Sequence, residues 1–365
     1  MIREVTDSSS IADLCRNLEA PARATRPIRV SEPEVHPFAA SDGVELRLLR
    51  FPGGSKGPVV LSHCIGVSSL MYALDTIETN LLEYLYEHGF DVWLLDHRLS
   101  VALPASQQPS TLDDVATKDY PATVAKVREL TGAESIQIVA HGVGSSTLTM
   151  AILSGLAGVR SAVCSQVSTH LQVSFLNLAK TSLFMASVLS VIGVRSLTAF
   201  GADQSWRDRL YDKSLRLYPI QREERCQSSV CRRITSMYGA LYEHDQLNDE
   251  THAALRDMFG VVNIQAFRQL GRITRTGHVV TADGSNSYLP HVDRMTVPTA
   301  FIHGEENDCV LPESTAQTHE LLKEHHGDIH RRHVIPGYGH VDCMFGKNAS
   351  ADVYPLVLQH LEETA

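Results

Sequence analysis

Apolar positions follow two different periods between residues 58 and 166 of the chain. Short runs rich in β-branched residues are typical of buried strands, and the segments between them repeat apolar residues at helical spacing. This alternation predicts βαβ units that build a mostly parallel sheet with helices on both faces. The expected strands are 44–51, 58–62, 90–95, 135–140 and 161–166, and the expected helices are 74–88 and 112–131.

The alternation stops near residue 168 and resumes after residue 290. The pattern of the intervening segment predicts mostly helices. After it, the pattern predicts strands at 297–303 and 330–335 and helices at 314–326 and 350–361. Caps inserted in this way lie over the carboxyl ends of the strands, where open α/β sheets place their sites. We therefore expect an N-terminal arm at 1–33, an α/β core at 34–167 and 291–365, and a helical cap at 168–290.

The segment from Ser135 to Leu153 predicts a buried strand, a sharp turn and a helix. Small residues, Ala140 and Gly144, flank the turn, as in the G-x-S-x-G nucleophile elbow of α/β-hydrolases. The predicted fold class is therefore the α/β-hydrolase fold. The central position of this elbow, however, is Gly142, which has no nucleophile.

Two further loops follow predicted strands and should open on the same edge of the sheet. One contains Asp308 and the other contains His340, so the chain order of elbow, acid and histidine matches that of α/β-hydrolases. In that arrangement the acid orients the imidazole and the imidazole moves the proton. Asp308 also fits a turn or capping residue before Pro312, and Glu305 or Glu306 are alternative acids.

The chain resembles α/β-hydrolases of the acid-lipase type. The resemblance is closer to the hydrolase modules associated with cholesterol-oxidase-like (GMC) flavoenzymes, and it extends over nearly the whole chain after residue 35. It implies ester or acyl-transfer chemistry, with Asp308 and His340 matching the acid and the base. The segments that carry it are 74–94, 307–315, 339–342, 345–349 and 353–354.

The chain departs from that family at two positions. The family carries Cys or Ser where this chain has Gly142, and His-Gly where this chain has His63-Cys64. The two loops face each other across the site in this fold. We therefore hypothesise that the nucleophile has moved to Cys64, with His340 as base and Asp308 as orienting acid, because a thiol beside an imidazole is readily activated.

Other interpretations stay open. Cys64 is also a small apolar filler after a buried strand. A lyase, isomerase or cyclase would need only His340 and Asp308 for acid–base chemistry. A third interpretation is a protein that has lost its nucleophile and binds its ligand without catalysis. Around the site, we expect Val143 to supply an oxyanion N–H, with His63, Ile65, His141 and Gly142 beside the substrate. The apolar segment 171–200 favours a bulky hydrophobic substrate.

Composition and charge limit the expected binding partners and the expected cellular compartment. A net charge of −10 argues against nucleic-acid binding. Seven scattered cysteines without an apolar signal segment predict reduced thiols in a cytoplasm. The apolar run 183–194 is too short to span a membrane. Cys226 and Cys231 lack a second Cys or His pair, so no metal is expected, and no motif predicts a cofactor. A homodimer is left open.

Overall fold

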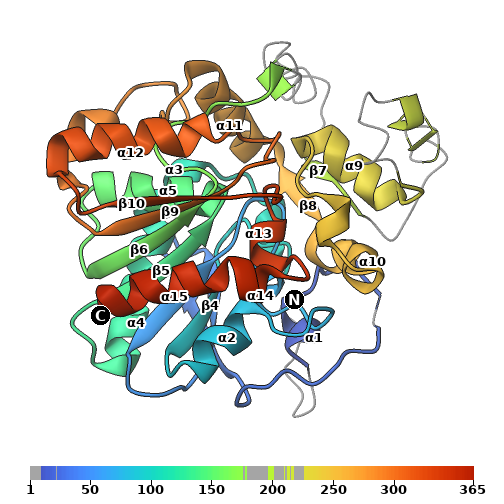
Figure 1. Cartoon of the computed structure of the whole chain (residues 1–365), viewed down its shortest axis with the longest axis horizontal. Coiled ribbons are helices and arrows are strands. Elements are labelled where there is room, and N and C mark those ends of the chain that lie inside the picture. The colour runs from blue at the N-terminus through green and yellow to red at the C-terminus, as the bar shows by residue number, and fades with distance from the viewer. Residues whose placement is uncertain are drawn as a thin grey trace.

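A computed structural model describes residues 10–21, 23–175, 177–178, 196–200, 209, 212–213, 215–217 and 226–365 of the chain (Figure 1). Within these residues, an eight-stranded sheet has the order β1-β2-β4-β3-β5-β6-β9-β10. Its strands are β1 (Glu34–Ala39), β2 (Glu45–Phe51), β3 (Pro58–Ser62), β4 (Asp91–Asp96), β5 (Ile136–His141), β6 (Val159–Ser165), β9 (Thr299–Gly304) and β10 (Arg331–Ile335).

The sheet is parallel from β4 to β10 and antiparallel only where β2 pairs with β1 and with β4. Every residue of β3, β4 and β5 is buried, which explains why these strands appear in the sequence as continuous apolar runs. The carboxyl ends of β3, β5, β9 and β10 share one edge of the sheet. The predicted α/β-hydrolase fold class is therefore confirmed.

Helices cover both faces of the sheet. Alternate strand residues point to opposite faces: Val59 and Leu61 pack toward one cluster of buried side chains, and Val60 packs toward the other. The first cluster includes residues of α2 (Leu81–Glu87) and α15 (Tyr354–Glu363), and the second includes residues of α4 (Tyr120–Thr131), α5 (Val143–Leu153) and α12 (Glu313–His326).

One expected boundary differs from the structure, and one strand was missed. The helix expected at 74–88 begins only at Leu81, because Asn80 caps it and Glu83 completes a capping box with the Asn80 backbone. The strand β1 was not expected from the sequence. It is an edge strand with exposed and half-buried side chains and contains Pro37, so its pattern lacks a buried apolar run.

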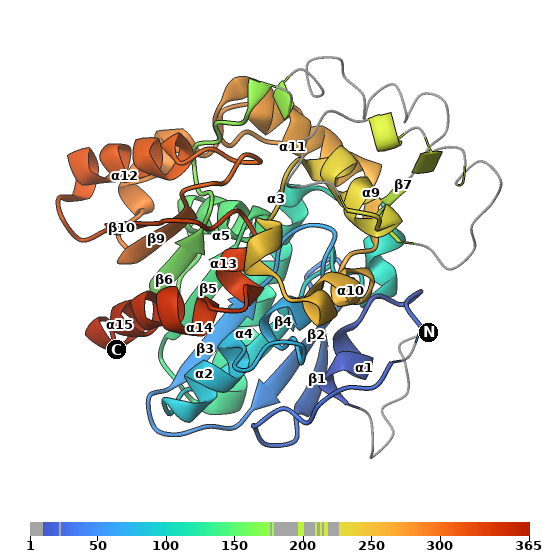
Figure 2. The ribbon, with the colours of Figure 1, turned by 45° about the vertical axis from the view of Figure 1, so that its right-hand side comes forward.

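In the segment 168–290, which we expect to form a cap and call the cap below, the described residues form α9 (Ser229–Tyr238), α10 (Asp249–Met258) and α11 (Ile264–Thr276). In the same segment, β7 (Ser196–Thr198) pairs with β8 (Val261–Asn263). Figures 1 and 2 show α9 and α10 together on the side away from the C-terminus. The apolar run 183–194 lies outside the described residues. None of the helices within them is both long and apolar enough to cross a membrane.

Candidate active site

The turn between β5 and α5 has the backbone shape of a nucleophile elbow. Gly142 has a φ of 55° and a ψ of −125°, a conformation that side chains rarely adopt. Its N–H donates to the carbonyl of Ser165 (3.0 Å). At Gly144, a Cβ would lie 2.5 Å from the carbonyl oxygen of His63, so the loop after β3 passes too close for a side chain. The elbow is therefore preserved in shape although its nucleophile is absent.

The sulfur of Cys64 fills the space beside Gly142. A Cβ built on Gly142 would lie 2.5 Å from Cys64 Sγ and 3.1 Å from His340 Nε2. A real Cβ never approaches a sulfur this closely, so an elbow side chain and the Cys64 sulfur exclude each other. The structure thus brings Cys64, Gly142 and His340 together around one small volume.

Two backbone N–H groups face the Cys64 sulfur. The N–H of Val143, at the start of α5, donates to Sγ over 3.3 Å, and the N–H of Ile65 also lowers the pKa of the thiol. Burial has the larger effect and raises the pKa of Cys64 to about 11. The N–H groups expected to form the oxyanion hole therefore donate to the Cys64 sulfur itself. Because the pKa is raised, Cys64 is mainly a thiol at neutral pH.

His340 follows β10 and is almost completely buried, with 4% of its surface exposed. Burial holds its pKa well below the usual range, and the neighbouring His141 and His303 lower it further. The ring of His141 packs edge-on against it, with 4.9 Å between centroids. His340 is therefore a neutral imidazole at physiological pH, and its two nitrogens carry one proton between them.

Asn307 lies against the inner nitrogen of that imidazole. Its Nδ2 is 3.0 Å from His340 Nδ1. The orientation of the amide is fixed on both sides. Asn307 Oδ1 accepts the N–H groups of Cys309 (3.1 Å) and Val310 (2.9 Å), and Nδ2 donates to Oε1 of Gln166 (2.9 Å). The NH₂ group, a donor only, consequently faces His340.

This contact determines which nitrogen of His340 carries the proton. Because Asn307 donates to Nδ1, that nitrogen must accept, and the single proton sits on Nε2. In a triad with an acid, the carboxylate accepts from Nδ1–H and leaves Nε2 free as a base. Here Nε2–H points toward the volume beside Gly142 as a hydrogen-bond donor. The base role expected for His340 does not fit this tautomer.

The acid expected from the sequence is not at the site. Asp308 is exposed, and so are the alternatives Glu305 and Glu306, whereas Asn307 is buried. The expectation that Asp308 orients His340 is therefore wrong. Because the orienting group of a triad is usually an acid, the sequence favours Asp308 over Asn307 for that role. No local sequence pattern shows which of two consecutive loop residues turns inward. The Gln166 that holds Asn307 was also missed; its φ of 75° marks a strained backbone position.

Two further histidines expected at the site, His63 and His141, are buried in the protein interior. His63 is fully buried, donates from Nδ1 to the carbonyl of Cys64 (2.6 Å) and stacks on His97. His141 is equally buried, and its Nδ1 lies 3.2 Å from Ser165 Oγ. Burial lowers the pKa of His141 to about 3, so it is neutral. These histidines hold the loops after β3 and β5.

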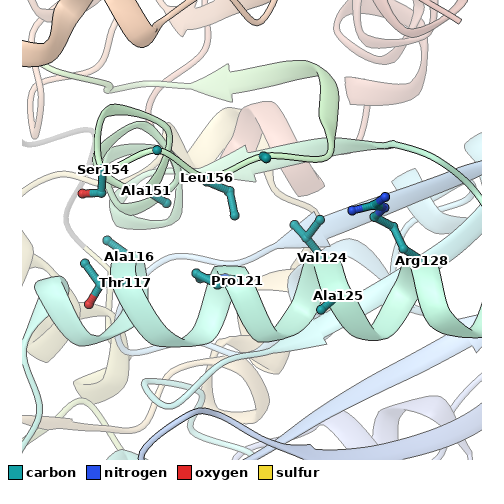
Figure 3. A pocket seen from close by; sticks show the side chains of 11 residues that line it. Ala116, Thr117, Pro121, Val124, Ala125, Arg128, Ala151, Ser154 and Leu156 are labelled. Carbon is teal, nitrogen blue, oxygen red and sulfur yellow. The ribbon is translucent and has the colours of Figure 1, made fainter.

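A surface pocket of about 320 Å³ lies elsewhere, between α4 and the end of α5 (Figure 3). Pro121 and Val124 of α4 face Ala151 and Leu156 across it. Gly142 precedes the first residue of α5 and Leu156 follows its last turn, so the two sites are separated by the length of the helix, about 16 Å for eleven residues. The pocket is therefore separate from the elbow.

Comparison of the sequence with known protein families identifies the family of this chain. The model of the α/β-hydrolase fold family matches residues 57–347, which covers the elbow, Asn307 and His340. The chain belongs to this family. Human lipase member K is 21% identical to it over 90% of the chain and 88% of the lipase. The lipase lipl-3 of Caenorhabditis elegans is 31% identical, but the match spans only 32% of the chain and 33% of that lipase.

Solved structures confirm the fold of this α/β-hydrolase. A soluble variant of monoglyceride lipase from Saccharomyces cerevisiae aligns with a TM-score of 0.56 at 14% identity, over 93% of the chain and 97% of the lipase. An esterase from Pyrococcus furiosus aligns with a TM-score of 0.55 at 13% identity, over 96% of the chain and 97% of the esterase. These alignments show the fold alone. The resemblance to lipases is confirmed by the sequence relatives, and the association with flavoenzymes stays a prediction.

The competition between positions 64 and 142 gives a first prediction. We expect Gly142→Ser to destabilise the protein by about 1–3 kcal/mol because its Cβ meets Cys64 Sγ. In the double variant with Cys64→Gly, most of that cost should disappear. The measurement is a double-mutant cycle from urea unfolding.

The control is Gly144→Ala, whose Cβ meets the carbonyl of His63 rather than the sulfur. Cys64→Gly should not rescue it. Equal destabilisation by Gly142→Ser with and without Cys64 would contradict this account of the site.

Proposed function

We propose that this α/β-hydrolase transfers or hydrolyses acyl groups of hydrophobic esters, lactones or thioesters, with Cys64 as the nucleophile. The observation that carries the proposal is the position of the sulfur. Cys64 Sγ lies 2.5 Å from the point that an elbow Cβ occupies, and His340 Nε2 lies 3.1 Å from the same point. A nucleophile attached to position 64 thereby reaches the place that the fold reserves for one attached to position 142.

In this proposal the thiolate form of Cys64 attacks the acyl carbon. A bond forms between Sγ and that carbon, the bond from the carbon to the leaving oxygen breaks, and the alcohol leaves with a proton from solvent, which balances the one the thiol lost. Water or a second alcohol then cleaves the thioester and regenerates the thiol. Val143 N–H, Ile65 N–H and His340 Nε2–H are the donors available to the developing negative charge.

The surroundings of Cys64 support a hydrophobic substrate. Ile65 is buried, and Tyr72 and Tyr238 lie close enough for the negative form of Cys64 to raise the pKa of their hydroxyls. Tyr238 belongs to α9 of the cap, so cap and core meet at the sulfur. The similarity to lipase member K and to monoglyceride lipase points in the same direction. An acyl chain is the substrate class we infer.

Activity should depend on pH through the thiol rather than the imidazole. Only the thiolate attacks, and the pKa of Cys64 is raised to about 11, so the reactive fraction increases about tenfold per pH unit from neutral pH upward. We expect kcat/KM for 4-nitrophenyl acyl esters to rise continuously between about pH 7 and pH 10. The pKa of His340 is too low to add an inflection near its usual value.

Two cysteine variants test whether the Cys64 thiol is the group responsible for this activity. Cys64→Ala should lose roughly 10³-fold or more of the activity, whereas Cys15→Ala, which removes a buried thiol of α1 (Ile11–Cys15), should retain it. A plateau above pH 7, or full activity of Cys64→Ala, would rule out the thiolate as nucleophile.

The Asn307 contact predicts that a single substitution improves the enzyme. In Asn307→Asp, the carboxylate accepts from Nδ1–H, so Nε2 loses its proton and becomes a base for the Cys64 thiol. We expect ester hydrolysis at pH 7 to increase by about 10²-fold or more, since the reverse exchange in a serine protease triad costs about 10⁴-fold. Steady-state assays of wild type and variant measure this.

The matched control is Asp308→Asn, which changes an exposed neighbouring acid and should leave the rate unchanged. If Asn307→Asp is no faster than wild type, the assignment of the proton to Nε2 is wrong.

The same contact favours a second candidate function. With Nε2–H as a donor beside the N–H groups of Val143 and Ile65, the site suits stabilisation of an enolate or alkoxide without a covalent intermediate. A lyase, isomerase or cyclase reaction in which the proton passes to solvent needs such donors. It predicts that Cys64→Ala keeps most activity while His340→Ala does not, which separates it from acyl transfer.

A further inference from the structure

Four potential metal ligands converge in the cap, apart from the elbow. Cys226 precedes α9, Cys231 lies in its first turn, His244 opens the short helix η5 (His244–Gln246), and His252 lies in α10. One ligand atom from each residue lies within 4.8 Å of the others. Two thiols and two imidazoles are therefore gathered from four separate segments into one cluster.

The spacing within the cluster fits a bound zinc ion. Cys231 Sγ and His244 Nε2 are 3.5 Å apart. The edge between a sulfur at 2.3 Å and a nitrogen at 2.0–2.1 Å from a tetrahedral zinc ion is also about 3.5 Å. Two thiolates with two imidazoles are a donor set typical of structural zinc sites.

Two neighbouring contacts support a metal rather than chance proximity. The hydroxyl of Tyr242 donates to Cys231 Sγ over 3.0 Å, as expected of an outer partner that stabilises a metal-bound thiolate. The side chain of Cys226 forms hydrogen bonds with Cys231, His244 and His252. The two thiols and two imidazoles thus face one another, as the ligands of a single metal ion must.

We propose that Cys226, Cys231, His244 and His252 bind one Zn²⁺ ion in a closed tetrahedral site. The sequence-based expectation that Cys226 and Cys231 lack a second pair is wrong, because folding brings His244 and His252 beside them. With four protein ligands no coordination position remains for substrate, so the role of the ion is structural.

The proposed zinc site is linked to His340 through a short segment of the chain. Between Cys231 and His244 the chain passes Leu241, whose carbonyl accepts the N–H of His340 (3.0 Å) and the N–H of Val341 (2.8 Å). Zinc would fix both ends of this connecting segment, so the ion is a positioning element for His340. Loss of the metal should therefore loosen the cap and the loop after β10 together.

The test measures metal in the purified full-length chain. We expect one zinc per chain by elemental analysis, and Co²⁺ exchanged into the wild-type protein should give the intense visible bands and thiolate charge-transfer absorption of tetrahedral cobalt. Cys231→Ser and His252→Ala should lose most of the metal. Cys309→Ser, which changes a half-buried cysteine outside the cluster, should keep it.

The cobalt spectrum is recorded on wild type, so the result does not depend on the variants folding. Chelation of wild type should also lower Tm by several degrees, and added zinc should restore it. A chain that holds no metal and yields no tetrahedral cobalt spectrum would overturn the proposal, as would a Cys226–Cys231 disulfide found by peptide mass. These readouts do not involve acyl transfer, so they are independent of the proposed function.

Discussion

The site depends on one small volume at the end of β5 that holds either a side chain on residue 142 or the sulfur of residue 64. The elbow backbone delivers a Cβ to within 2.5 Å of Cys64 Sγ, so the two cannot coexist. With glycine at the elbow, the sulfur enters from the loop after β3 and receives the N–H of Val143. The space beside the elbow is therefore filled by a sulfur from the loop after β3 instead of a side chain on residue 142.

A second constraint is the direction of the hydrogen bonds around His340. Backbone N–H groups of Cys309 and Val310 hold the oxygen of Asn307, and Gln166 holds its nitrogen, so the amide cannot turn over without losing these bonds. The imidazole therefore presents Nε2–H to the site. The site is therefore a group of N–H donors around the Cys64 thiol. This arrangement stabilises negative charge but offers no base beside the thiol to remove its proton.

The sequence predicts those parts of the fold whose burial follows a regular period. The central strands are buried on both faces and stand out as apolar runs, while the edge strand β1 has no such pattern and is missed. Cys64 and His340 follow directly from their places after predicted strands. Asn307 does not, because the turn after β9 decides which of residues 307 and 308 faces inward, and that depends on backbone bonds formed only in the folded loop.

The cap illustrates the same limit. Cys226 and Cys231 are neighbours in sequence, but His244 and His252 join them only through the packing of α9, η5 and α10, which no local spacing encodes. Contacts within one helix or strand can be predicted from a single sequence, whereas contacts between elements become apparent only in the folded structure.

The central claim, that Cys64 attacks the substrate, is tested most directly by trapping the intermediate. The protein is mixed with an activated acyl ester, quenched in acid within the first turnovers, and mapped by peptide mass spectrometry. The account predicts one acyl group per chain on the peptide that contains Cys64 and none in Cys64→Ala. Turnover of the ester with no acylated peptide, or with acylation spread over the other cysteines, would contradict it.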